Sequence, residues 1–169
     1  MKTPDYLIIV STKTGEGKPI SKDDIIKHHT QLRAHGGLEF NRPAFDYLVK
    51  INGDLETILP EGAPNEVDLL GISEGTEGLN GTPKYLAYAG GMTEKATKEK
   101  DTRTDEQKET LASVVQFYIK RFPGIQVFGW NQIPARKEDK NPAFNVKAWL
   151  EEIGIPSKNH LQMQVETTN

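Results

Sequence analysis

The sequence has no cysteine, so it can form neither disulfide bonds nor thiolate metal sites. No apolar run approaches the roughly 18 residues that a membrane-spanning helix needs. The first apolar run, Tyr6 to Val10, is too short for a secretory signal. The formal net charge of -3 gives no general attraction for nucleic acid or for an anionic membrane. We therefore expect a cytoplasmic or phage-encoded chain that has neither nucleic acid nor a membrane as its partner.

Motifs that carry chemistry are also scarce. No glycine-rich segment fits a phosphate-binding or dinucleotide-binding pattern, so we expect no cofactor. His28 and His29 are adjacent, not four residues apart as two metal ligands on one helix face would be. Ser11 and His29 are a conceivable nucleophile and base, but no G-x-S-x-G turn surrounds Ser11. The sequence alone therefore indicates no catalytic residue and no metal ligand.

What the sequence does contain is enough for one globular domain. A chain of 169 residues can bury a sizeable core. Hydrophobic residues make up 36% and charged residues 27%, which suits a globular protein with a polar surface. We expect the domain to span residues 1–156. The polar residues 157–169 then form a frayed C-terminal tail.

Apolar patterning divides the domain into strands and helices. Short apolar runs predict strands at residues 6–10, 45–51, 54–59, 85–89 and 125–128. Apolar residues at helical spacing predict helices that begin after residues 21, 104 and 145. The resulting order is strand, helix, hairpin, long loop, strand, helix, strand, helix. This order predicts a single mixed β-sheet flanked by helices, in the α/β or mixed α+β class.

Two helix starts carry a capping pattern. Ser21 precedes Asp24 by three residues, and Thr104 precedes Gln107 by three, the spacing of a capping box. Asn145 is a suitable cap for the last helix. In the first helix His29 falls on the apolar face, so we expect a buried core histidine there and an exposed neighbour before it. The apolar stripe of the second helix consists of Leu111, Val114, Val115, Tyr118, Ile119 and Phe122.

Glycine and polar residues mark the loops. Asn52-Gly53 predicts a hairpin turn with positive φ at both positions. Residues 11–19 and the highly charged residues 93–103 read as solvated loops. Residues 60–83 form a long surface excursion with one apolar patch at residues 67–72, and loops of such length are often binding walls or lids.

Several motifs together resemble the zinc-dependent N-acetylmuramoyl-L-alanine amidase family, which includes phage amidase-type lysozymes and peptidoglycan recognition proteins. The resemblance runs from about residue 5 to residue 153 and depends on the order and spacing of individually weak motifs. These are the first strand, Asp24-Ile25 with His28-His29, Ala44 to Tyr47, the Asn52-Gly53 turn, Tyr85 to Gly91, Thr104 with Gln107, and Gly129-Trp130 followed by Asn141-Pro142.

The departures from that family fall on its chemistry. The resemblance places the three zinc-ligand positions at Val10, Trp130 and Asn141, and the position of the assisting tyrosine at Phe45. Valine and tryptophan offer no lone pair for a metal, and a neutral amide is a poor zinc ligand. Without zinc, water at neutral pH is too weak an acid to supply hydroxide for attack on an amide. We expect the Trp130 N–H to reach a backbone or Asn141 oxygen instead, with its ring and Phe45 filling the old metal site.

The resemblance therefore implies a zinc-less, non-catalytic homologue that binds peptidoglycan fragments or a protein partner through the old cleft. One alternative is an active amidase with a relocated site at His29 or His35. Another is a phage-type regulator or inhibitor that uses the loop at residues 60–83. The residues expected to line the cleft are Val10, Ser11, Phe45, Trp130, Asn131, Lys140 and Asn141.

Overall fold

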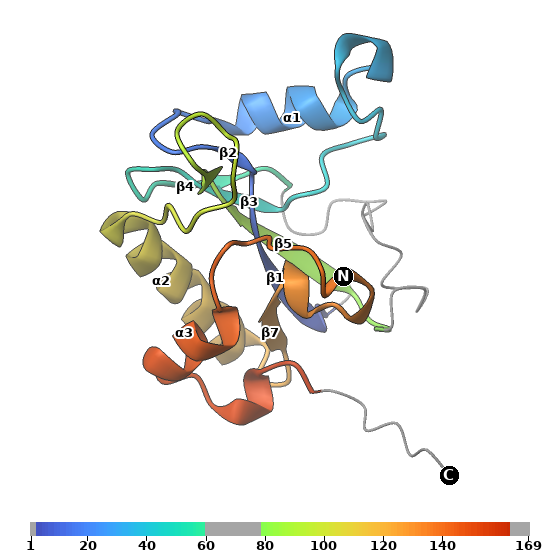
Figure 1. Cartoon of the computed structure of the whole chain (residues 1–169). Coiled ribbons are helices and arrows are strands. Elements are labelled where there is room, and N and C mark those ends of the chain that lie inside the picture. Colours follow the sequence, from blue (N-terminus) through green and yellow to red (C-terminus); the bar gives the residue numbers. More distant parts are fainter. Residues whose placement is uncertain (1–2, 60–78, 163–169) are drawn as a thin grey trace.

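The computed structural model describes residues 3–59 and 79–162, in which a five-stranded sheet is flanked by helices (Figure 1). The strands of this sheet are β1 (Tyr6–Ser11), β3 (Tyr47–Val49), β4 (Leu55–Thr57), β5 (Pro83–Tyr88) and β7 (Gln126–Gly129). The helices are α1 (Lys22–Thr30), α2 (Asp105–Arg121) and α3 (Val146–Glu152). The mixed sheet flanked by helices that the sequence predicts is confirmed.

The strand order is β4-β3-β5-β1-β7. Strand β1 runs parallel to both β5 and β7, and β3 runs parallel to β5, while the edge strand β4 is antiparallel to β3. Ser11 pairs with Tyr88, and Ile9 pairs with Gly129. The carboxyl ends of β1, β5 and β7 therefore meet at one edge of the sheet, which is where ligands of open α/β sheets commonly bind.

Every residue of β1 and β5 is buried, as expected for parallel strands that are covered on both faces. Leu7 and Ile9 pack with the apolar stripe of α2 and with α3 on one face. Ile8 and Val10 point to the other face, where α1 contributes Ile25 to a second apolar cluster. Residues of β1 thus alternate between two cores, and Val10 belongs to one of them.

The predicted helix caps are confirmed. Ser21 Oγ accepts the Asp24 N–H at 3.4 Å, and Asp24 Oδ2 accepts the Ser21 N–H at 2.8 Å. Thr104 and Gln107 form the same reciprocal pair at 3.1 and 3.0 Å. Gln107 also joins α2 to the sheet, because its buried Nε2 donates to the backbone oxygens of β3 and of residue 89. Asn145 Oδ1 accepts the N–H of residue 148 at 3.0 Å at the start of α3.

The hairpin turn differs from its prediction in one respect. Only Gly53 has positive φ, at +90°, whereas Asn52 does not. The Gly53 N–H donates to Lys50 O, and Asn52 Oδ1 accepts the Asp54 N–H, both within 3.0 Å. The turn is therefore longer than two residues, because the side chain of Asn52 bonds the backbone instead of adopting the left-handed conformation.

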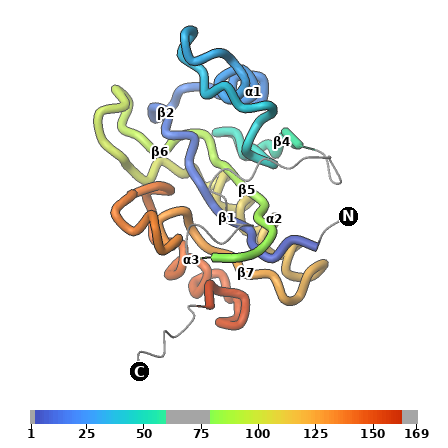
Figure 2. The backbone as a smooth tube through the Cα atoms, turned by 90° about the vertical axis from the view of Figure 1, so that its right-hand side faces the viewer, coloured from blue at the N-terminus to red at the C-terminus, as the bar shows by residue number. Residues whose placement is uncertain are grey.

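Two expected loops contain structure. A small parallel sheet joins β2 (Thr14–Gly15) to β6 (Gly91–Met92), and Figure 2 shows the two segments side by side. In the charged segment at residues 93–103, the side chain of Arg103 is only 8% exposed, pairs with Asp101 at 2.9 Å and stacks on Phe144. The loop prediction is therefore wrong for Ser11, which ends β1, and for residues 14–15, and the solvated-loop prediction is wrong for the side chain of Arg103.

The domain boundary at residue 156 stays a prediction. The first residues of the predicted tail are packed, so the prediction of a frayed tail is wrong for them. Ser157–Asn159 form a short 3-10 helix. Asn159 is fully buried and donates to the backbone oxygens of Pro123 and Ile125 at 2.9 Å. His160 is also buried. The predicted excursion at residues 60–83 lies outside the described residues up to residue 78, including its apolar patch.

Candidate functional site

The side chain of Asn141 joins the late loop to the end of β1. Its Oδ1 accepts the Ser11 N–H at 2.7 Å, and its Nδ2 donates to Ser11 O at 3.5 Å. The backbone oxygen of Asn141 accepts the Asn131 N–H at 3.0 Å. Both ends of the Asn141 amide are thus engaged by one residue of the sheet, and Asn141 is buried.

Trp130 is half-buried and packs on the apolar cluster that contains Val10. Its ring lies 6.3 Å from that of Tyr85, which lies 6.5 Å from that of Phe45. Tyr85, which the sequence reasoning missed, therefore links the two predicted aromatic residues. Its place in an all-buried strand was the available signal, since it points to the same face as Val10.

The indole N–H of Trp130 donates to Asp139 Oδ2 at 3.0 Å, so the expectation of a backbone or Asn141 acceptor is wrong. Asp139 Oδ1 also accepts the Asn141 N–H at 2.9 Å and lies 3.5 Å from Lys13 Nζ. Burial by itself would raise the pKa of Asp139. The Asn141 N–H, the Lys13 charge and the Trp130 N–H together lower this pKa below its usual value. An ionised carboxylate therefore holds the loop together.

The side chains at these three positions do not fit the zinc ion that the sequence resemblance implies. Val10 is fully buried among apolar side chains, Trp130 offers only an N–H donor, and the Asn141 amide is engaged with Ser11. Among the described residues no group of three or more His, Asp or Glu side chains is placed to hold a metal.

The alternative catalytic residues His29, Ser11 and His35 do not form a site together. His29 is buried and its Nδ1 accepts the Ala44 N–H at 2.9 Å. Burial, with a smaller contribution from the charge of His28, lowers the pKa of His29 to about 4. The predicted core histidine is confirmed. Ser11 Oγ accepts the Lys13 N–H, and His35 is exposed on a separate 3-10 turn.

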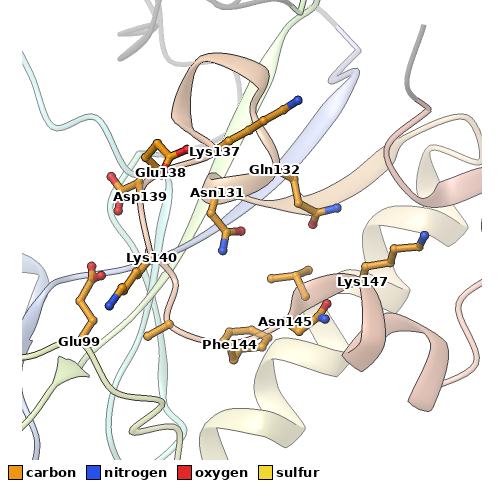
Figure 3. A pocket seen from close by; sticks show the side chains of 12 residues that line it. Glu99, Asn131, Gln132, Lys137, Glu138, Asp139, Lys140, Phe144, Asn145 and Lys147 are labelled. Carbon is orange, nitrogen blue, oxygen red and sulfur yellow. The ribbon is translucent and has the colours of Figure 1, made fainter. Parts of the chain in front are cut away.

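An open pocket of about 720 Å³ lies beside this network (Figure 3). Asn131 and Lys140, two of the predicted cleft residues, line it. The other five do not, namely Val10, Ser11, Phe45, Trp130 and Asn141. A second cavity of about 700 Å³ is also lined by Lys13. It shares with the first the residues Glu99, Glu138, Asp139 and Lys140. The lining residues that sequence reasoning missed are Glu99, Gln132, Lys137, Glu138, Asp139, Ala143, Phe144, Asn145, Val146 and Lys147.

Local packing shapes this pocket. Gly129 ends β7 where a Cβ atom would lie 2.7 Å from Val146 and 3.2 Å from Pro142, so a glycine lets the strand end approach the start of α3. The guanidinium of Arg103 lies 3.4 Å from the centre of the Phe144 ring, a cation–π contact that stabilises the position of this ring. The pocket thus has one fixed aromatic side chain among amides and charged groups.

Solved structures share this architecture. The amidase LysC from Clostridium intestinale is 13% identical, with a TM-score of 0.61 over 91% of this chain and 87% of that one. An AmpD derivative is 20% identical, with a TM-score of 0.62 over 90% and 85%. A human peptidoglycan recognition protein in complex with glycosamyl muramyl pentapeptide is 14% identical, with a TM-score of 0.51 over 79% and 74%. No protein-family model and no curated protein matches the sequence.

The structure is a mixed α+β protein with a pocket at the carboxyl ends of its parallel strands. Within this class the chain has the fold of N-acetylmuramoyl-L-alanine amidases and peptidoglycan recognition proteins. The fold that the sequence motifs imply is therefore confirmed. Within the described residues no helix is long and apolar enough to cross a membrane.

Proposed function

We propose that this chain binds peptidoglycan fragments in the pocket beside Asn131 and Lys140 and does not cleave them. The observation that carries the proposal is a contrast at one edge of the sheet. The positions that would hold a metal are occupied by groups engaged inside the protein, while a polar pocket next to them stays open. A structural neighbour holds a glycosamyl muramyl pentapeptide, so this fold accommodates that class of ligand.

The chemistry of the pocket suits such a ligand. Asn131, Gln132 and Asn145 offer amide groups, and Phe144 offers an aromatic surface. Amide side chains pair with the hydroxyl groups of sugars and with peptide bonds. Of the predicted cleft residues, we therefore keep only Asn131 and Lys140 in the proposed ligand site. Asn141, which bonds Ser11, anchors the loop that lines the pocket.

A sedimentation assay with purified sacculi tests binding, and chromatography of the supernatant tests cleavage. We expect the unaltered protein to sediment with sacculi and to release no peptide that begins with L-alanine. Asn131→Ala should weaken sedimentation, whereas Lys120→Ala, an exposed change on α2, should not. Released peptides would instead support the relocated-amidase alternative. No sedimentation at all would favour a protein partner.

A further inference from the structure

We propose that the outer edge of β4 and the apolar groove between β4 and α2 bind an extended, basic segment of a partner protein. This surface lies at the opposite edge of the sheet from β7. Among the described residues, none lines both this groove and the pocket beside Asn131. The inference therefore adds a second binding surface that the proposed function does not use.

The backbone of β4 is open to another strand. Within residues 3–59 and 79–162 its only neighbour in the sheet is β3. At the start of the β3–β4 pair, Asp54 O accepts the Lys50 N–H at 2.8 Å, so the backbone of Asp54 faces β3. Backbone groups alternate in direction along an antiparallel strand, so those of Leu55 and Thr57 point away from β3. An edge of this kind is a template for an added strand.

The side chains next to this edge form an apolar groove of about 500 Å³. Leu55 of β4 and Phe117 of α2 line it and are 43% and 54% exposed, although both are large apolar residues. Tyr47 and Tyr118 also line it. Alternate side chains of a strand point to the same face of a sheet. A strand added beside β4 would therefore direct every second side chain toward the groove, which favours apolar residues at those positions.

Hydrogen bonds hold the two sides of the groove in place. Thr110 Oγ1 donates to Gly53 O, which joins α2 to the turn before β4 (Figure 1). The hydroxyls of Tyr47 and Tyr118 lie 2.6 Å apart and share a hydrogen bond. A surface that is already formed has little conformational freedom to lose when a partner binds. The groove is thus suited to an extended segment without rearrangement of the fold.

The carboxylates at this edge favour a basic segment. Asp54 precedes β4, Glu56 lies in β4, and Glu109 is the one charged side chain among the described residues that line the groove. None of these three carboxylates forms an ion pair within residues 3–59 and 79–162. A lysine or arginine of the bound segment opposite Glu56 would therefore gain a cross-strand ion pair.

The nearby positive charges belong to neighbouring elements. The Lys22 N–H at the start of α1 donates to Glu56 Oε1 at 3.2 Å, and Lys50 follows β3. Lys120 and Arg121 lie in the last turn of α2. A strand added on the outer side of β4 lies next to β4 itself, which carries no cation. The nearest charge opposite such a strand is therefore negative.

A second copy of the chain fits this edge less well. Two antiparallel β4 strands related by a twofold axis at Glu56 would place the two Glu56 side chains opposite each other. A twofold axis at Leu55 would place Asp54 opposite Glu56. Like charges directly opposite one another destabilise a strand pair. The edge therefore favours a foreign, basic segment over self-association.

Two synthetic peptides test the charge preference. Both have eight residues and carry the same apolar side chains at alternate positions, with lysine between them in one peptide and glutamate in the other. Fluorescence anisotropy with the unaltered chain gives the two dissociation constants. We expect the lysine peptide to bind about fivefold more tightly in low salt, since attractive cross-strand pairs replace repulsive ones. This ratio should shrink as salt is raised, because exposed charges are screened.

Variants locate the binding at the edge. Leu55→Ser and Phe117→Ser should each weaken binding of the lysine peptide about fivefold or more, because the groove loses an apolar side chain. Leu32→Ser is the matched control, since Leu32 is 57% exposed and lies before a separate 3-10 turn. This control should leave binding unchanged. Thermal melts check that each exposed change leaves the fold intact.

Backbone methylation tests strand pairing without any change to the protein. Every second N–H of a strand bound at β4 faces β4, so two forms of the lysine peptide are N-methylated on complementary sets of alternate amides. We expect one form to lose binding and the other to keep it. Equal behaviour of the two forms, equal effects of Leu55→Ser and Leu32→Ser, or no saturable binding of any peptide would overturn the inference. A dimer in analytical ultracentrifugation that Leu55→Ser dissociates would assign the edge to a second copy instead and would also overturn it.

Discussion

Asn141 bonds both backbone groups of Ser11, with its Oδ1 on the N–H at 2.7 Å and its Nδ2 on the carbonyl at 3.5 Å. This pair joins the late loop to β1 at a position where the resemblance places a zinc ligand. The two hydrogen bonds of this amide hold the loop to the strand. The account therefore predicts that the pocket is held in place by side-chain bonds and needs no ion.

Removal of this amide should destabilise the fold. Asn141→Ala leaves the buried Ser11 N–H without its partner, which costs about 1–3 kcal/mol. Urea unfolding measures the loss. Asn131→Ala is the matched control, because no hydrogen bond of its side chain is present within the described residues, and we expect a change below about 0.5 kcal/mol. Equal losses in the two variants would contradict this role for Asn141.

Asp139 should stabilise the fold through its charge. Its pKa is lowered in the folded state, so its contribution is present above the ordinary aspartate pKa of about 3.9. The contribution is lost as pH falls through the folded value. Urea midpoints should therefore fall below about pH 4, and Asp139→Asn should show a smaller fall. Glu138→Gln, its exposed neighbour, should behave as the unaltered chain. An acid-induced loss that is identical in Asp139→Asn would rule out this contribution.

His29 should act in a higher pH range. Its pKa is lowered from 6.5 to about 4, so the unfolded chain takes up a proton before the folded chain does. The stability that its neutral form provides is complete above pH 6.5 and is lost progressively down to about pH 4. The total is about 3 kcal/mol at 1.36 kcal/mol per pKa unit.

His29→Gln tests this origin, because glutamine keeps an acceptor for the Ala44 N–H but does not titrate. We expect the variant to lose less stability than the unaltered chain between those two pH values. His28→Gln, on the exposed side of α1, is the control. A pH dependence that persists in full in His29→Gln would assign it to other groups.

Trp130→His should lower stability and restore no zinc binding. The variant loses ring contacts and the bond to Asp139, which for a half-buried tryptophan costs about 1–3 kcal/mol. Trp130→Phe keeps a ring and should lose about 1 kcal/mol. Urea unfolding and elemental analysis of protein purified without a metal-affinity tag supply the two readouts. One zinc per chain in the histidine variant would show that the site still accepts a metal.

Sequence patterns predicted the parts of the fold that depend on interactions between residues close together in the chain. The capping boxes at Ser21 and Thr104 depend on residues three apart, so the sequence contains the whole interaction. The strands β2 and β6 have two residues each, too few for any periodicity. The burial of Asn159 depends on carbonyls more than 30 positions away. No local pattern reports such a contact.

The candidate site shows the same contrast between what short-range patterns predict and what long-range contacts decide. Motif order led to Asn131 and Lys140, which line the pocket, and to Asn141, which supports it. The acceptor of the Trp130 N–H was missed, because a loop has no periodicity that would predict the direction of Asp139. Lys147 was missed because a lysine on an exposed helix turn looks like ordinary surface.

A titration of the ¹⁵N-labelled chain with the glucosaminyl-muramyl pentapeptide, followed by amide NMR spectra, tests the central claim most directly. The account predicts saturable shifts concentrated at residues 129–132 and 137–147, with no signal from a cleaved peptide. Spectra without saturable shifts, shifts concentrated elsewhere in the chain, or signals from a released peptide would contradict it.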